Sequence, residues 1–201
     1  MKLYYAPGAC SLASHIALQE TGLPFEIDKL DFATRKTAGG EDFTQINPKG
    51  YVPTLRLDDG SILTEGPAIL QYVADRKPEA RLAPAAGTME RYRLQEWLTF
   101  IGTELHKSFG PLFRNPPPEA REQAAAQLTK RFGYVNTFLA DKEYLVGGHF
   151  SVADIYLFVV CGWCPHVGYD LSPFPNVQKL IARVGARPAA QKAMKDEGLI
   201  K

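Results

Sequence analysis

The chain has few cysteines and no long apolar segment. Three cysteines among 201 residues are too few for the disulfide framework that stabilises many small secreted proteins. No apolar run is long enough to span a bilayer. Residues 1–3 lead directly into strand-like sequence, without the apolar region and small-residue cleavage site of a signal peptide. We therefore expect a cytoplasmic protein.

An excess of charge of either sign is also missing. The 23 lysines and arginines balance 22 aspartates and glutamates, for a net charge of +1. Proteins that bind nucleic acid or a membrane surface usually carry a basic excess or a basic stripe, so we expect neither partner. The histidines at 15, 149 and 166 are scattered without metal-ligand spacing, and we assign no metal site.

Prolines and glycines are plentiful, and they divide the first part of the chain into short elements. Residues 2–6 and 25–30 have the pattern of strands, and residues 11–21 have helical spacing before Gly22. The Asp-Asp-Gly sequence at 58–60, flanked by apolar residues, predicts a hairpin. With the helix that follows the hairpin, residues 1–77 are predicted to form a β-α-β-(α)-β-β-α domain.

The rest of the chain is predicted to be helical. Residues 78–87, rich in Pro, Ala and Gly, are typical of an interdomain linker, and residues 88–201 form an all-helical domain. In that domain Ser151 and Asp154 have the spacing of a capping box at a helix start. A break near residues 185–188 divides the last two helices.

One cysteine, Cys10, stands where the first strand meets the first helix. The helix start has unpaired N–H groups and the positive end of the helix dipole, so it would stabilise a thiolate there. A packed structural cysteine is the alternative. Because Ala13 occupies the position of a second cysteine, any disulfide exchange at this site requires an external thiol. Ser11 is interpreted as a capping residue of the same helix.

Two further segments suggest the ligand of this thiol. A proline that opens a strand, as Pro53 does, can follow a cis peptide bond, which would leave the backbone N–H and C=O of Val52 able to pair with an extended peptide. Glu65 and Gly66 begin another helix, whose N–H groups suit a carboxylate, while the Glu65 side chain suits an ammonium group. A thiol, a strand edge and a cradle for an amino-acid head group together indicate glutathione.

At these residues the sequence resembles the bacterial beta-class glutathione S-transferases. The resemblance covers the whole chain through PGACSLASH, NPKGYVP, LTEGPAI, ELHKSFGPLF and SVADIYLF, in that order. It implies an α/β thioredoxin-like N-terminal domain that binds glutathione as co-substrate, an all-α C-terminal domain that carries the electrophile site, and a homodimer. The glutathione-binding residues that it implies are Cys10, Arg35, Lys36, Val52, Pro53, Glu65, Gly66, Thr99, Thr103, Glu104, His106 and Lys107.

Three of these positions depart from the residue that the family commonly has. Arg35 stands where lysine is common, and either Arg35 or Lys36 could pair with the glycyl carboxylate of glutathione. Gly66 replaces a frequent serine, which removes a hydroxyl but keeps the backbone N–H. Thr99 replaces a frequent asparagine.

The two catalytic residues implied are Cys10 and His106. His106 follows Thr99 by seven positions and Thr103 by three, on one polar helix stripe. With an ordinary pKa near 6.5, it could accept a proton from, or donate a hydrogen bond to, the glutathione sulfur. Lys107 would add positive charge beside it.

The function that follows is conjugation of the glutathione thiolate to small hydrophobic electrophiles, in detoxification and including dehalogenation. Phe109, Phe113 and Trp163 are candidates for the electrophile pocket. Two alternatives stay open: glutathione-dependent disulfide reduction through a Cys10 mixed disulfide, and a non-catalytic protein that binds glutathione or a hydrophobic ligand. The CGWC sequence at 161–164 lacks the setting of a redox-active thiol pair, and we interpret its cysteines as structural.

Overall fold

The computed structural model describes residues 1–201, which divide into two compact units. One unit comprises Met1–Leu82 with Arg187–Lys201, and the other comprises Ala83–Ala186. No helix is long and apolar enough to cross a membrane. The first unit contains β1 (Lys2–Tyr5), α1 (Ser11–Thr21), β2 (Glu26–Lys29), α2 (Phe43–Ile46), β3 (Thr54–Arg56), β4 (Ile62–Thr64), α3 (Gly66–Arg76), the 3₁₀ helix η1 (Pro78–Ala80) and α9 (Pro188–Asp196).

The first unit has the thioredoxin-like arrangement that the sequence predicts. Its four strands lie in the order β2-β1-β3-β4. β1 and β2 are parallel, while β3 is antiparallel to both β1 and β4. The parallel pair is joined through α1, as parallel strands require, and the Asp-Asp-Gly turn joins β3 to β4. The short helix α2 lies between β2 and β3, at the position of the bracketed helix in the predicted order.

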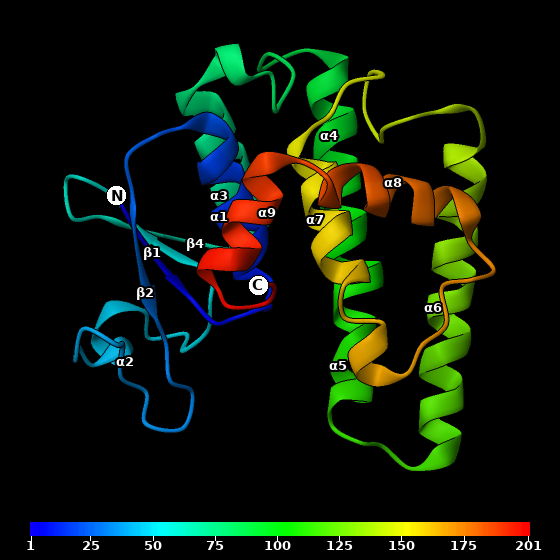
Figure 1. Ribbon diagram of the computed structural model, residues 1–201, viewed down its shortest axis with the longest axis horizontal. Helices are drawn as coiled ribbons and strands as arrows, with labels where there is room; N and C mark the ends of the chain where they lie inside the picture. Colours follow the sequence, from blue (N-terminus) through cyan, green and yellow to red (C-terminus); the bar gives the residue numbers. More distant parts are fainter. The chain divides into compact units, whose positions relative to one another are not determined.

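Alternation along β1 directs its side chains to the two faces of the sheet. Leu3 and Tyr5 point to one face, and Tyr4 points to the other, where its ring lies 5.7 Å from that of Phe43 in α2. Figure 1 shows α1, α3 and α9 together on one side of the strands, with α2 apart from them. The sheet thus has helical cover on both faces, and the ends of β1 and β3 carry the candidate site.

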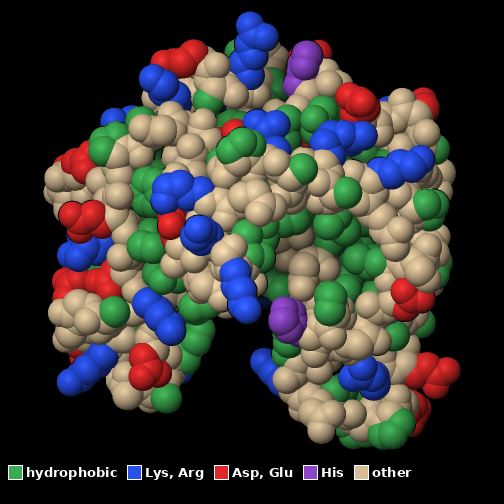
Figure 2. Space-filling view, viewed as in Figure 1, with side chains coloured by type: hydrophobic (Ala, Val, Ile, Leu, Met, Phe, Trp, Pro, Cys, Tyr) green, Lys and Arg blue, Asp and Glu red, His purple; other side chains and the backbone are tan.

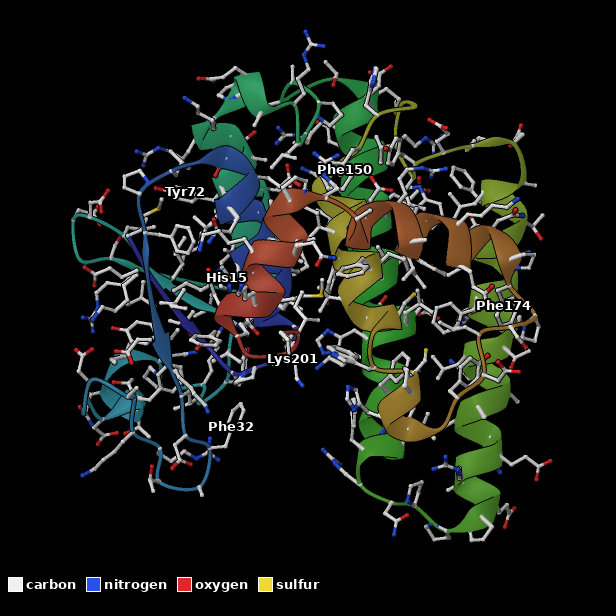
Figure 3. All side chains as sticks on the ribbon, in the orientation of Figure 1. His15, Phe32, Tyr72, Phe150, Phe174 and Lys201 are labelled. Carbon is white, nitrogen blue, oxygen red and sulfur yellow. The ribbon has the colours of Figure 1, made fainter.

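The last fifteen residues belong to the first unit rather than to the helical domain predicted for residues 88–201. Arg187 forms a bidentate ion pair with Glu20 of α1, at 2.5 and 2.9 Å. Glu197 is buried and lies 3.0 Å from Nδ1 of His15, which α1 directs toward α9 (Figure 3). These contacts join residues more than 160 positions apart, so no local pattern in the sequence reveals them.

The second unit is helical throughout. Its elements are α4 (Met89–Phe100), the π-helix η2 (Ile101–His106), α5 (Lys107–Phe113), α6 (Pro118–Phe138), η3 (Leu139–Asp141), α7 (Val152–Cys161), η4 (Pro165–Val167) and α8 (Pro175–Gly185). The predicted capping box is confirmed at the start of α7: Asp154 accepts hydrogen bonds from the Ser151 N–H and hydroxyl, both at 2.8 Å. Burial raises the pKa of Asp154 to about 6.

A π-helical turn interrupts the long helix that carries most of the predicted site residues of this unit. The sequence predicts one continuous helix after Thr88, and its apolar stripe is confirmed because Leu94, Leu98, Ile101 and Leu105 are all buried. Between Ile101 and His106 the backbone adopts π-helical geometry. Such turns are frequent at functional sites, and this one ends at His106.

Candidate functional site

Cys10 lies at the start of α1, as predicted. It is the N-cap residue, it is partly exposed, and its thiol donates a hydrogen bond to the Val52 carbonyl oxygen at 3.3 Å. The interpretation of Ser11 as a helix cap was wrong. The buried Ser11 hydroxyl instead accepts from the Ala6 N–H at 3.2 Å and lies 3.3 Å from the Ala6 carbonyl oxygen, so it ties the helix start to the end of β1.

The Val52–Pro53 peptide bond is cis, as the sequence analysis expected. The Val52 carbonyl oxygen accepts a hydrogen bond from the Cys10 thiol. A backbone carbonyl has two lone pairs, so this oxygen can accept a second hydrogen bond from an extended peptide. The contact places the sulfur of Cys10 at the same edge where such a peptide would pair.

Glu65 is the N-cap residue of α3, in a backbone conformation rare for a residue with a side chain (φ 69°). Its carboxylate Oε1 accepts hydrogen bonds from Lys49 Nζ at 2.8 Å and from the Tyr51 hydroxyl at 2.6 Å. Beside it, a Cβ on Gly66 would lie 3.8 Å from Pro53, which is ordinary contact. The Glu65 carboxylate thus already pairs with the ammonium group of Lys49. Pairing with an ammonium group is the role predicted for this side chain.

The two candidate cations on the preceding loop differ in their surroundings. Arg35 has a positive φ of 59° and donates from Nη1 to the Gly50 carbonyl at 2.9 Å. Lys36 is exposed, and its backbone pairs with Asp42. Arg35 therefore contacts the segment that leads to Val52, whereas Lys36 reaches toward solvent.

In the helical unit, the predicted residues lie along α4, η2 and the start of α5. Thr99, Thr103 and Lys107 are exposed, and the Thr103 hydroxyl donates to the Thr99 carbonyl at 3.0 Å. The Glu104 carboxylate forms an ion pair with Arg131 of α6. Thr99, Thr103 and Lys107 are thus open to solvent, whereas Glu104 is engaged with another helix of its own unit.

His106 is half-buried, and its ring packs against two aromatic side chains. Its Nδ1 lies 2.7 Å from the Tyr156 hydroxyl, and its ring centroid lies 4.7 Å from that of Trp163. Burial and the neighbouring Lys107 charge lower the pKa of His106 to about 4. The imidazole is therefore neutral at pH 7 and a weaker base than an ordinary histidine, so it can donate one hydrogen bond but supplies no positive charge.

Comparison with known proteins settles the family. The family model for the glutathione S-transferase N-terminal domain matches residues 8–76. The family model for the glutathione S-transferase C-terminal domain matches residues 96–188. Glutathione S-transferase GstA of Escherichia coli O157:H7 is 45% identical over 99% of this chain and 100% of its own. This chain belongs to the glutathione S-transferase family.

Solved structures narrow the assignment to one class of these transferases. The bacterial beta-class glutathione S-transferase of Sphingomonas chungbukensis is 52% identical, with full coverage of both chains and a TM-score of 0.96. A sphingomonad glutathione S-transferase solved in complex with glutathione is 49% identical, also with full coverage and a TM-score of 0.96. The chain is therefore a beta-class member, as the motifs indicated.

The three aromatic residues predicted for the electrophile side of this transferase form one cluster. Trp163 lies 5.6 Å from Phe109 and 5.8 Å from Phe113, between ring centroids. Phe109 is fully buried, whereas Phe113 is 53% exposed. Since Trp163 also contacts His106, the cluster brings an apolar surface next to the candidate catalytic imidazole.

The CGWC cysteines lie in the same transferase unit but in a different environment from Cys10. Cys161 ends α7, and Cys164 precedes η4; both are buried free thiols. Burial raises the pKa of Cys164 to about 12 and raises that of Cys161 well above its ordinary value. Both are protonated at neutral pH, which supports the structural interpretation because the thiolate is the reactive form.

A large cavity of about 820 Å³ in the transferase contains none of the predicted residues. It lies between α4, α6 and the loop 142–148, and aromatic rings from Trp97, Tyr134 and Phe138 line it. On the face shown in Figure 2, basic and acidic side chains are interspersed, so no surface of a single charge sign marks a site on that face.

Lys49 and Tyr51 were not predicted from the sequence as site residues, yet both donate hydrogen bonds to the Glu65 carboxylate. Both lie within NPKGYVP, one of the segments that carries the family resemblance. A lysine and a tyrosine just before the predicted cis proline could have indicated that this segment contributes polar side chains to the site. Their partner, however, is 14 to 16 residues away, and only the β3–β4 hairpin brings it back.

Proposed function

We propose that this beta-class transferase joins the sulfur of glutathione to small hydrophobic electrophiles, with Cys10 and His106 as its catalytic residues. The observation that supports it most directly is that one unit combines the Cys10 thiol, the cis Val52–Pro53 strand and the charged Glu65 helix start. The sphingomonad glutathione S-transferase that is 49% identical to this chain was solved in complex with glutathione.

Each charged end of glutathione has a candidate partner in this proposal. Glu65 takes the α-ammonium of the γ-glutamyl residue, and the Gly66 N–H takes the α-carboxylate at the start of α3. Arg35 or Lys36 pairs with the glycyl carboxylate. The backbone of Val52, oriented by Pro53, pairs with the cysteinyl residue as a strand would. Thr99, Thr103, Glu104 and Lys107 complete the proposed binding set.

The chemical task is to present the bound sulfur as a thiolate and to hold the electrophile in line with it. His106 serves as the proton acceptor or hydrogen-bond donor for that sulfur, because its ring is neutral and the Tyr156 contact at Nδ1 fixes its orientation. The aromatic cluster of Phe109, Phe113 and Trp163 supplies the apolar surface for the electrophile.

A homodimer and a cytoplasmic location are part of the same proposal. The helices α4 and α6 carry Met89, Tyr92 and Tyr134, each more than half exposed. Exposed apolar side chains of this size are among the groups that a dimer interface would cover. Sedimentation equilibrium at micromolar concentration tests the dimer, and a mass of 22.2 kDa, that of one chain, would contradict it.

The deciding experiment is the initial rate of glutathione conjugation to 1-chloro-2,4-dinitrobenzene, with wild-type, Cys10→Ala and His106→Ala proteins side by side. We expect turnover well above the uncatalysed rate, with roughly a 10²-fold loss in His106→Ala, the scale of a removed acid–base group. Absence of turnover in wild-type protein that still binds glutathione would contradict conjugation. Glutathione-dependent disulfide reduction that Cys10→Ala abolishes would then identify the alternative activity.

A further inference from the structure

The ion pair between Lys49 and Glu65 was not predicted from the sequence. It lies where the head group of the substrate is proposed to bind. Lys49 Nζ lies 2.8 Å from Glu65 Oε1 and 2.9 Å from Thr64 Oγ1. Both side chains of the pair are about half exposed. An exposed ion pair of this kind contributes little to stability, so stability does not account for it well.

The head group of a γ-glutamyl peptide is itself an ion pair. Its α-ammonium and α-carboxylate are attached to the same carbon atom. A protein cation next to a protein anion is complementary to such a zwitterion, since each charge of the ligand then meets the opposite charge of the protein. Lys49 and Glu65 supply such a pair in the one place where Glu65 is proposed to bind the ammonium.

Neighbouring contacts hold this pair in position. The Tyr51 hydroxyl donates to the same Glu65 oxygen at 2.6 Å, and the Lys49 ammonium lies 5.9 Å from the centre of the Tyr51 ring. Between these two residues, the Gly50 carbonyl accepts from Arg35. The segment 49–51 is thus anchored to both residues proposed for the charged ends of glutathione, and its next residue is Val52.

We infer that Lys49 is a substrate-binding residue that pairs with the α-carboxylate of the γ-glutamyl group, while Glu65 pairs with its α-ammonium. When the ligand binds, Lys49 exchanges its contact with Glu65 for one with the ligand carboxylate, and no charge is left unpaired. The pair therefore selects a free α-amino-acid head group over a peptide end that bears only one charge. This inference rests on the proposed binding of glutathione.

The test compares wild-type protein, Lys49→Met and Lys77→Met by isothermal titration calorimetry. Lys77 is a matched control, because it is a partly exposed lysine of the same unit in an ion pair of the same length, 2.8 Å, with Glu79. The ligands are glutathione, an analogue without the α-carboxylate (4-aminobutanoyl-Cys-Gly) and an analogue without the α-ammonium (glutaryl-Cys-Gly).

We expect Lys49→Met to weaken glutathione binding by roughly three- to tenfold, the range of a partly exposed charge-assisted contact. The loss should persist with glutaryl-Cys-Gly and disappear with 4-aminobutanoyl-Cys-Gly. Lys77→Met should bind all three ligands as wild type does.

Three results would overturn the inference. Equal affinity of wild type and Lys49→Met for glutathione would show that Lys49 does not contact the ligand. Tighter binding by Lys49→Met would identify Lys49 as a competitor of the ammonium instead. An equal loss for 4-aminobutanoyl-Cys-Gly would mean that Lys49 acts only by placing Glu65. Failure of the wild-type protein to bind glutathione at all would contradict the proposed function. This outcome is distinct from the three results that contradict only the role of Lys49.

Discussion

The Val52 carbonyl oxygen accepts a hydrogen bond from the Cys10 thiol, with Sγ 3.3 Å away. This contact joins the start of α1 to the residue before the cis proline, 42 positions later in the chain. β1 and β3 are paired in the sheet, which brings the two loops at their ends together. The same sulfur is therefore positioned both by a helix start and by a strand edge that can bind a peptide.

The three cysteines should differ sharply in reactivity. Native protein treated with 5,5′-dithiobis(2-nitrobenzoate) should release one equivalent of thionitrobenzoate per chain, because Cys161 and Cys164 are each 2% exposed and their raised pKa values keep them protonated. Cys10→Ser should release none before unfolding. A second fast-reacting thiol in native protein would contradict the structural interpretation of the CGWC segment.

His106 should titrate near pH 4 in the folded protein, well below the ordinary histidine value of about 6.5. The unfolded chain then binds a proton more readily than the folded chain between these two values, so the stabilisation from burying the neutral ring is lost as pH falls from 6.5 toward 4. Proton NMR of the imidazole Cε1–H measures the midpoint directly.

A control for this titration is Lys107→Met. It removes the positive neighbour, which is the smaller of the two causes of the lowered pKa, so the midpoint should rise but stay below 6.5. Denaturant unfolding of wild type and His106→Gln at pH 7 and pH 5 should show a smaller acid destabilisation in the variant. A wild-type midpoint between 6 and 7 would rule out the burial argument.

Loss of the Glu197 carboxylate should destabilise the first unit. Glu197 accepts from the Gly8 N–H at 2.9 Å and contacts His15 at 3.0 Å, and His15 is fully buried. Glu197→Ala leaves both groups without this acceptor, at a cost of about 2 to 4 kcal/mol in the free energy of unfolding. Urea denaturation measures it, and Asp196→Ala, a change at a more exposed carboxylate, should cost far less.

Gly66→Ser should be tolerated and should improve glutathione binding. The new Cβ would lie 3.8 Å from Pro53, which requires no movement, and replacing a glycine reduces the conformational entropy of the unfolded chain. The added hydroxyl gives the head-group carboxylate one further donor, so we expect the KM for glutathione to fall by roughly two- to fivefold. An unchanged KM with an unaltered melting temperature would show that the hydroxyl does not reach the ligand. A large drop in melting temperature would contradict the steric argument.

Features that depend on neighbouring residues were predicted well from the sequence. The strand and helix order of residues 1–77, the Ser151–Asp154 capping box and the placement of Cys10 at a helix start all follow from periodicity, turn residues and capping patterns. Each of these is decided by backbone conformation and hydrogen bonding within a few positions. The family could also be identified, because its motifs are local segments in a set order.

Only the tertiary structure decided which partners these residues have and which environment surrounds them. Glu197 contacts His15, Lys49 pairs with Glu65, and the His106 ring packs edge-to-face against Trp163 and contacts the Tyr156 hydroxyl. Each contact depends on which elements pack together. Burial in that packing, rather than residue type, lowers the pKa of His106 and raises those of Cys161 and Cys164. The sequence thus determined which reactive groups are present, and packing determined their protonation and their partners.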